Sequence, residues 1–229
     1  MAEASASAPR WRPGSRVARL RATRSFTIVL VPIVVSFLFA SIAPDAPWTS
    51  AVLVLLESAT LVLAMWTSGV ARADSQTSIG LIVVAIVAAV TVIVSGGSLL
   101  VGIVGILSGL LTLATVAVIS IGVLDQGEVN AQSVGGAICI YILIGLIFLF
   151  VYSAIAALGD GNLFAQGTDG TRSIRLYFSF VTLATLGYGD YTPAGDLGRT
   201  VAAVEALFGQ LYLVTVIALL VSRLGARRW

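Results

Sequence analysis

Histidine and lysine are absent from this 229-residue chain, and cysteine occurs once, as Cys139. Without histidine, catalysis by histidine and metal sites with histidine ligands are excluded. A single cysteine cannot form an intrachain disulfide or a zinc cluster, and its position in an apolar run predicts a small buried side chain. No pairing of a nucleophile with a base is visible among the remaining residues, so we expect neither an enzyme nor a bound cofactor.

Charged residues are scarce as well. They make up 10% of the chain, whereas hydrophobic residues make up 58% and the mean hydropathy is +1.03. Soluble domains contain about a quarter charged residues. A chain this apolar cannot cover itself with polar surface, so lipid is its expected solvent, and the predicted fold class is an all-α membrane protein.

Six apolar stretches are candidates for crossing a bilayer, which takes about 20 residues in a helix. They comprise residues 26–42, 49–68, 78–94, 99–123, 135–158 and 197–224. Proline, glycine and serine lie between consecutive stretches, as in the Ser95–Ser98 segment, and such residues interrupt helices. We therefore expect six transmembrane helices. The first four would form a bundle over residues 25–124, and the last two would belong to a separate unit over residues 133–224.

The 13 basic residues are all arginines, with six in the first 24 residues and three in the last seven. With six spans, both clusters and Arg72 fall on one side of the membrane, which the positive-inside rule makes the cytoplasm. We expect residues 1–24 to be disordered and residues 225–229 to be a short tail, with both termini cytoplasmic in a cell membrane. The N-terminal arginines would also meet anionic lipid, although a solvated segment that only fixes topology is the simpler interpretation. Nothing in the distribution indicates a nucleic-acid partner.

The polarity of the chain changes within residues 159–196, which lie between the last two apolar stretches. The segment begins polar and becomes apolar from Leu176 to Leu183. That length suits a short helix and not a span. The glycine-containing strip Ala184–Asp190 follows it. Such a pattern predicts a re-entrant loop, because non-helical backbone at membrane depth is tolerated only where protein buries it or where it lines water.

The stretch Thr182–Asp190, TLATLGYGD, resembles the selectivity-filter signature of the potassium channel superfamily. The resemblance extends to aromatic residues in the preceding short helix. It extends also to Arg199 and Gly209, which follow Gly189 at the spacing of minimal two-span bacterial potassium channels. It covers about residues 135–221 and implies a pore helix and filter between the fifth and sixth transmembrane helices.

The resemblance implies specific ion-binding residues. Potassium exchanges its hydration shell for rings of backbone carbonyls in such filters. The carbonyls would be those of Thr185, Leu186, Gly187 and Tyr188, with the Thr185 hydroxyl closing the inner end. One chain supplies one strip, so a fourfold ring implies a homotetramer, with K⁺ as the permeant ion.

Other residues of the strip are expected to support these carbonyls. Gly187 and Gly189 would let the backbone alternate between ordinary and mirror-image dihedral angles, because glycine adopts positive φ readily. The side chains of Leu186 and Tyr188 would point away from the ion and pack behind the filter. Asp190 would lie at the extracellular mouth, and Tyr177 would donate a hydrogen bond to it.

The strip also departs from the family pattern at three positions. Leu186 replaces the commoner valine, Ala184 replaces threonine, and Val181 stands where some bacterial channels carry glutamate.

Three functions other than a selective potassium channel are also open. If the departures loosen the carbonyl cage, the protein would be a weakly selective cation channel, but the full GYGD strip argues against this. A subunit of the superfamily's potassium-uptake branch is disfavoured, since those chains carry four degenerate filter repeats. A non-conducting partner subunit is disfavoured by the complete filter.

The resemblance assigns a cavity and gate to the last helix. Gly209 would be a hinge, although a small residue that admits close helix packing is an equally natural interpretation. Gln210 would face the cavity, and Leu213 and Ile217 would line it below, forming an apolar surface that can gate by dewetting.

Two acidic residues lie inside predicted spans, where charge is costly. Glu205 is expected to bond to the back of the pore helix, near Ser179 or Thr182, with a proton site for gating as the alternative. Glu57 is expected to be protonated or to point into the bundle. Residues 99–123 contain no arginine, so strong voltage gating is not expected.

Overall fold

The computed structural model describes residues 26–68, 75–95, 97–124 and 131–219. The expected all-α fold is confirmed over these residues, which form seven α-helices and a short π-helical segment and contain no strand. The elements are α2 (Phe26–Ile42), α3 (Pro47–Ser68), α4 (Ser75–Ser95), α5 (Ser98–Leu124), α6 (Ala131–Leu158), α7 (Arg172–Leu183), α8 (Asp196–Tyr212) and η1 (Leu213–Ile217). The predictions for residues 1–24 and 225–229, and for the end of the last span, lie outside the described residues.

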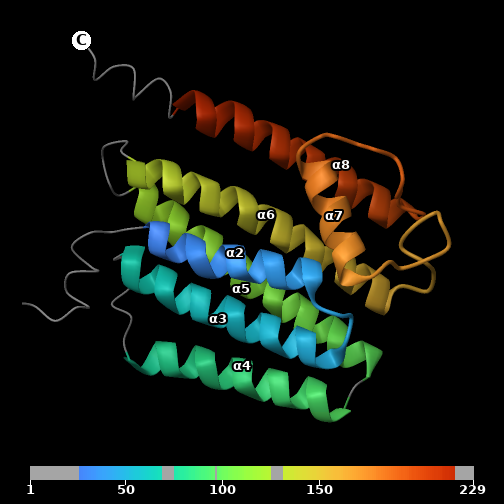
Figure 1. Cartoon of the computed structure of the whole chain (residues 1–229), viewed down its shortest axis with the longest axis horizontal. Coiled ribbons are helices and arrows are strands. Elements are labelled where there is room, and N and C mark those ends of the chain that lie inside the picture. The colour runs from blue at the N-terminus through green and yellow to red at the C-terminus, as the bar shows by residue number, and fades with distance from the viewer. Residues whose placement is uncertain (1–25, 69–74, 96, 125–130, 220–229) are drawn as a thin grey trace, which may run out of the picture.

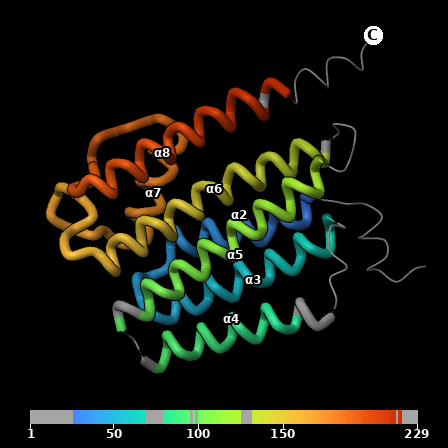
Figure 2. Tube along the Cα trace, turned by 180° about the vertical axis from the view of Figure 1, so that it is seen from behind, coloured from blue at the N-terminus to red at the C-terminus, as the bar shows by residue number. Residues whose placement is uncertain are grey.

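The long helices run side by side, as Figures 1 and 2 show. Helices α2, α3, α5 and α6 pack against one another, and α4 lies along the outer edge of this group, mainly against α3. On the opposite edge, the short helix α7 lies between the bundle and α8 (Figure 1). Helix α8 therefore has neighbours within the chain on one side, α7 and α6.

Four helical stretches are long and apolar enough to cross a membrane: Pro47–Ser68, Leu100–Leu124, Gln132–Leu158 and Asp196–Val216. By length and composition, the chain is a multi-pass membrane protein. The stretches Phe26–Ile42 and Ile79–Val94 are apolar but shorter. The described residues thus support four of the six predicted spans on this measure.

The centre of the bundle lies where α2, α3, α5 and α6 meet. It contains fully buried apolar side chains such as Ile33 and Leu146, and also Cys139, which confirms the burial predicted for the single cysteine. Several buried serines and threonines donate their hydroxyl protons to backbone carbonyls within their own helices, as Ser58 does to Val54 and Thr115 does to Leu111. Polar side chains are thereby accommodated in an apolar interior, where an unpaired group would be costly.

Small residues allow α5 and α6 to approach closely. A Cβ atom on Gly102 would lie 3.2 Å from the Cβ of Ala157, and one on Gly109 would lie 3.4 Å from the Cβ of Phe150. Gly105 differs from these two glycines, because a Cβ there would meet nothing within 4 Å. The packing of α5 on α6 is therefore tight at two glycines and open between them.

A cluster of aromatic rings holds the loop before α7 against the helices. Phe164 forms isolated β-bridges with Thr168 and Pro193. Its ring packs edge-on against Phe178 and Tyr191 at centroid distances of 5.2 Å. Edge-to-face packing at such distances is favourable. The cluster fixes the two ends of the segment between α6 and α8, and the strip after α7 is thereby held in place.

Candidate functional site

Helix α7 begins earlier than the apolar pattern predicted. The prediction placed it over residues 176–183, whereas the structure has Arg172–Leu183. Thr171 caps the helix, since its side-chain oxygen accepts a hydrogen bond from the amide of Ile174. The first turn contains Arg172 and Arg175, which are charged but have partners inside the protein, so apolar periodicity alone could not reveal it.

The strip after α7 has an alternating backbone. Thr185, Gly187 and Gly189 have φ values of 57°, 55° and 77°, whereas Leu186 and Tyr188 between them do not adopt positive φ. The expected alternation at the two glycines is present, and Thr185 extends it by one residue. Positive φ is uncommon for a residue with a Cβ atom, and the sequence offered no signal for it at Thr185.

Hydrogen bonds hold the start of the strip and leave its carbonyls free. The amides of Thr185 and Leu186 donate to the carbonyls of Thr182 and Val181, both at 2.9 Å. Within the described part of the chain, no hydrogen bond reaches the carbonyl oxygens of residues 185–188, and all four residues are exposed. An exposed run of unpaired carbonyls is able to coordinate a hard cation, because such cations prefer oxygen ligands.

The far end of the strip is held by a residue that the sequence did not indicate. Gln166 donates from Nε2 to the carbonyl oxygen of Asp190 at 2.8 Å. Its Oε1 accepts a hydrogen bond from the amide of Thr192 at 3.3 Å. Gln166 lies in the loop between α6 and α7, so only the folded loop brings it to this position.

The side chains of the strip are largely uncovered in a single chain. Leu186 is 57% exposed and Tyr188 is 67% exposed. The Tyr188 ring stacks on Tyr177 of α7, with centroids 6.4 Å apart and planes 15° apart. The side chains of Tyr177 and Asp190 are also close enough to interact.

Glu205 joins three helices. It is fully buried on α8, and its carboxyl oxygens lie 2.5 Å from the hydroxyl of Ser179 on α7 and 2.6 Å from that of Tyr152 on α6. The expectation that Glu205 bonds to the back of α7 near Ser179 is confirmed, and Tyr152 is an additional partner. Glu57 is likewise buried in the bundle, where Thr112 donates to it at 3.1 Å.

Gly209 lies where α8 touches the end of α7. A Cβ at this position would collide with the carbonyl oxygen of Leu183. Of the two interpretations of Gly209, close helix packing is thus directly supported. Gln210 and Leu213 lie on the exposed side of the helix. Ile217 falls in the π-helical segment η1, and its side chain is outside the part that the structure describes.

Much of α8 has no cover from its own chain. Leu207, Phe208 and Leu211 of α8, and Val214 of η1 after it, are each more than half exposed. A multi-pass membrane protein covers such a surface with lipid or with further protein. The exposed carbonyl strip and this apolar surface belong to adjoining segments of the chain, because α8 follows the strip directly.

Comparisons with known proteins find ion channels that are similar to this region. Residues 162–226 match a family model described as "Ion channel". Two curated proteins are similar. The inward rectifier potassium channel Kirbac3.1 of Paramagnetospirillum magnetotacticum is 31% identical over 103 residues, which are 44% of this chain and 35% of that protein. The probable potassium channel protein 2 of Methanocaldococcus jannaschii is 48% identical over 46 residues, which are 19% of this chain and 13% of that protein.

The matches are local. The chain spans about a third of the length of the first relative and a smaller part of the second. No solved structure matches the chain significantly. The family model covers the loop, α7, the strip and α8, so the similarity falls on the segment whose geometry is described above.

Proposed function

We propose that this chain is a subunit of a potassium-selective channel that conducts K⁺ passively across a cell membrane. The observation that carries the proposal is the alternating backbone at Thr185, Gly187 and Gly189, together with the unpaired carbonyls of residues 185–188. The family match and the names of the two similar proteins support the same function.

The proposed mechanism is replacement of the hydration shell. A potassium ion enters the filter only if protein oxygens compensate for the water that it loses. The carbonyls of Thr185, Leu186, Gly187 and Tyr188 would supply these oxygens, and the Thr185 hydroxyl would close the inner end. Neutral carbonyls bind each ion weakly enough for it to leave, and successive rings let neighbouring ions displace one another.

Four copies would be needed for the ring. One strip offers one carbonyl at each level, and a cyclic arrangement of four identical chains places four there. The exposed Leu186 and Tyr188 and the uncovered face of α8 support this assembly, because neighbouring copies would cover them. Gln210, Leu213 and Ile217 would then line a cavity below the filter, and its apolar part would gate by dewetting.

The proposed topology has six spans. Residues 25–124 would form a peripheral four-helix bundle, and residues 133–224 would form the pore unit with α7 as a re-entrant pore helix. The lengths of α3, α5, α6 and α8 support four of these spans. Both termini would be cytoplasmic, on the side of the arginine clusters.

Cation flux into liposomes tests the proposal. Purified protein is reconstituted into vesicles loaded with K⁺, and uptake of radioactive Rb⁺ or Na⁺ is measured as the K⁺ gradient runs down. The proposal predicts Rb⁺ uptake that Ba²⁺ blocks and Na⁺ uptake near that of protein-free vesicles. Equal uptake of both cations without Ba²⁺ block would contradict a potassium-selective filter.

A further inference from the structure

Gln166 binds the backbone at the outer end of the proposed filter from a neighbouring loop. Its Nε2 atom donates to the carbonyl oxygen of Asp190 at 2.8 Å, and its Oε1 atom accepts a hydrogen bond from the amide of Thr192 at 3.3 Å. A primary amide can do both because it carries a donor and an acceptor. These two hydrogen bonds, called the Gln166 clamp below, restrain the two successive peptide groups on either side of Tyr191.

The clamp extends a short pairing of backbone segments. The amide of Ala165 donates to the carbonyl of Thr192 at 2.8 Å, and the amide of Ala194 donates to the carbonyl of Leu163 at 2.9 Å. Gln166 is the next residue of the loop, but its side-chain amide makes the next contact in place of its backbone. The pairing therefore reaches the last residue of the strip only through this one side chain.

The loop that presents Gln166 is a tight turn. The amide of Phe164 donates to the carbonyl of Thr168 at 3.0 Å, and the amide of Gly167 donates to the carbonyl of Phe164 at 3.0 Å. Gln166 lies between these residues, with its side chain exposed. Hydrogen bonds on both sides of Gln166 thus fix the backbone that carries it.

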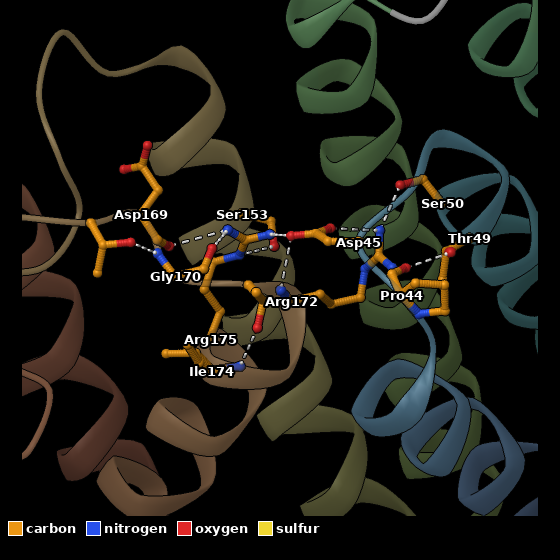
Figure 3. A network of polar contacts seen from close by, with 12 residues as sticks. Pro44, Asp45, Thr49, Ser50, Ser153, Asp169, Gly170, Arg172, Ile174 and Arg175 are labelled. Carbon is orange, nitrogen blue, oxygen red and sulfur yellow. Dashed lines mark hydrogen bonds and ion pairs between the residues drawn. The ribbon is translucent and has the colours of Figure 1, made fainter.

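The turn is tied to α7 and to the bundle by the buried Arg175. Its Nη1 atom donates to the carbonyl of Asp169 at 3.1 Å, and its Nη2 atom pairs with Asp45 at 3.5 Å (Figure 3). The carboxylate of Asp169 accepts a hydrogen bond from the amide of Leu163 at 2.8 Å, which closes the loop. A group that positions a functional site requires a rigid support of this kind.

Other parts of the protein do not restrain the same peptide groups. Among the described residues, the hydrogen bonds that reach the backbone of residues 189–192 come from Ala165 and Gln166. Val181 of α7 is buried and apolar, so its side chain cannot form a hydrogen bond. Tyr177 lies near Asp190 but contacts its side chain. The direction of the Asp190 carbonyl therefore depends on Gln166.

The strip is thus attached to the protein at two points. At its inner end, the amides of Thr185 and Leu186 donate to carbonyls of α7, both at 2.9 Å. At its outer end, Gln166 holds the carbonyl of Asp190. The peptide groups between these two points cannot rotate independently of them, so the orientation of the carbonyls of residues 185–188 depends on both attachments.

We propose that Gln166 is a positioning residue that keeps the outer end of the filter in its selective arrangement. The inference rests on the proposed channel function. A binding site discriminates between similar ligands only when its groups are held to within about 0.5 Å, and the clamp supplies this restraint where α7 no longer reaches the strip. Gln166 touches no ion and acts through Asp190 and Thr192.

Hydrogen exchange of the Thr192 amide in detergent-purified, full-length protein tests the clamp without ion conduction. Gln166→Met keeps the length of the side chain and removes both hydrogen-bonding atoms, so exchange at Thr192 should become about fivefold faster. Gln166→Glu keeps the acceptor for Thr192 and should exchange near the wild-type rate. Because Gln166 is exposed, both variants should unfold at the same temperature as the wild type.

The permeability ratio of K⁺ to Na⁺, from reversal potentials in planar bilayers, tests the positioning role. Both variants lack the donor to Asp190, so the ratio should fall by about fivefold in each. Acidifying the outer solution below about pH 4 protonates the carboxyl group introduced by Gln166→Glu. Protonation restores a donor, so the ratio should recover in Gln166→Glu and not in Gln166→Met, with the wild type measured at the same pH.

Asn162 provides matched controls, because it is an exposed amide in the same loop and does not take part in the clamp. Asn162→Leu removes an amide from the loop, and Asn162→Asp adds the charge that Gln166→Glu adds. Both controls should match the wild type in exchange at Thr192 and in the permeability ratio.

The outcomes are distinct. Unchanged exchange at Thr192 in Gln166→Met would overturn the clamp. Faster exchange with an unchanged permeability ratio, or the same fall in the Asn162 controls, would overturn the positioning role. A wild type that does not select K⁺ would instead count against the proposed function, and the exchange rates would still decide whether the clamp exists.

Discussion

The hydroxyl of Ser179 on α7 lies 2.5 Å from a carboxyl oxygen of Glu205 on α8. The same hydroxyl lies 2.9 Å from the carbonyl oxygen of Gly145 on α6. The Ser179 hydroxyl carries one proton, which it donates to the Glu205 carboxyl group or shares with the carbonyl of Gly145. The pair joins the pore helix to the helix that would line the cavity.

Replacing Glu205 with leucine should destabilise the protein. The hydroxyl of Tyr152 would remain buried without its partner, whereas Ser179 would keep the carbonyl of Gly145. A buried unsatisfied group costs about 1–3 kcal/mol. Glu205→Gln keeps hydrogen-bonding atoms at both positions and should stay near the wild type. Thermal unfolding in detergent measures the difference, and equal midpoints for the leucine variant and the wild type would refute the structural role of Glu205.

Replacing Gly187 or Gly189 with alanine should abolish potassium flux. Both glycines have positive φ, and nothing lies within 4 Å of a Cβ built on either, so the effect would come from the backbone conformation and not from a clash in the single chain. Gly161→Ala is the matched control, since Gly161 is also open but is not among the glycines with positive φ. Rb⁺ uptake into liposomes measures the effect. Normal uptake in either filter variant would defeat the filter assignment.

Gly209→Ala should loosen the contact between α7 and α8. The new methyl group would meet the carbonyl oxygen of Leu183, which belongs to the backbone and cannot rotate away. Overpacking of this kind costs about 1–3 kcal/mol. Gly135→Ala is the control, because this helical glycine has nothing within 4 Å and alanine should stabilise it by about 0.8–1 kcal/mol. If both variants unfold at the same temperature, close packing does not explain Gly209.

Open probability should depend weakly on voltage. A charge that moves across the whole membrane contributes about 2.3 kcal/mol per 100 mV, and α5, the fourth of the six predicted spans, contains no charged residue. Single-channel recording between about −100 and +100 mV checks this. A steep dependence, equivalent to several moving charges, would require a sensor outside α5.

The sequence predicted those features of the fold that depend on local composition. Apolar length indicated the helical stretches, and the glycines at 187 and 189 indicated where the backbone would alternate. The contact of Glu205 with Ser179 was also predicted, because a carboxyl group inside a span requires a polar partner.

Features that depend on contacts between distant segments could not be predicted in this way. Asp45 pairs with Arg172, 127 residues later in the chain, and no local pattern relates the two. This pairing also explains why α7 begins before its apolar part. Gln166 bonds to Asp190 only because the loop folds over the strip. The positive φ of Thr185 is a further example, since local preference opposes it.

The reversal potential under bi-ionic conditions tests the central claim most directly. Purified protein is fused into a planar bilayer with K⁺ on one side and an equal concentration of Na⁺ on the other. The account predicts a large reversal potential of the sign set by K⁺, and a current that Ba²⁺ blocks, because the carbonyls of residues 185–188 would compensate for dehydration of K⁺ better than of Na⁺. A reversal potential near zero would contradict a potassium-selective filter.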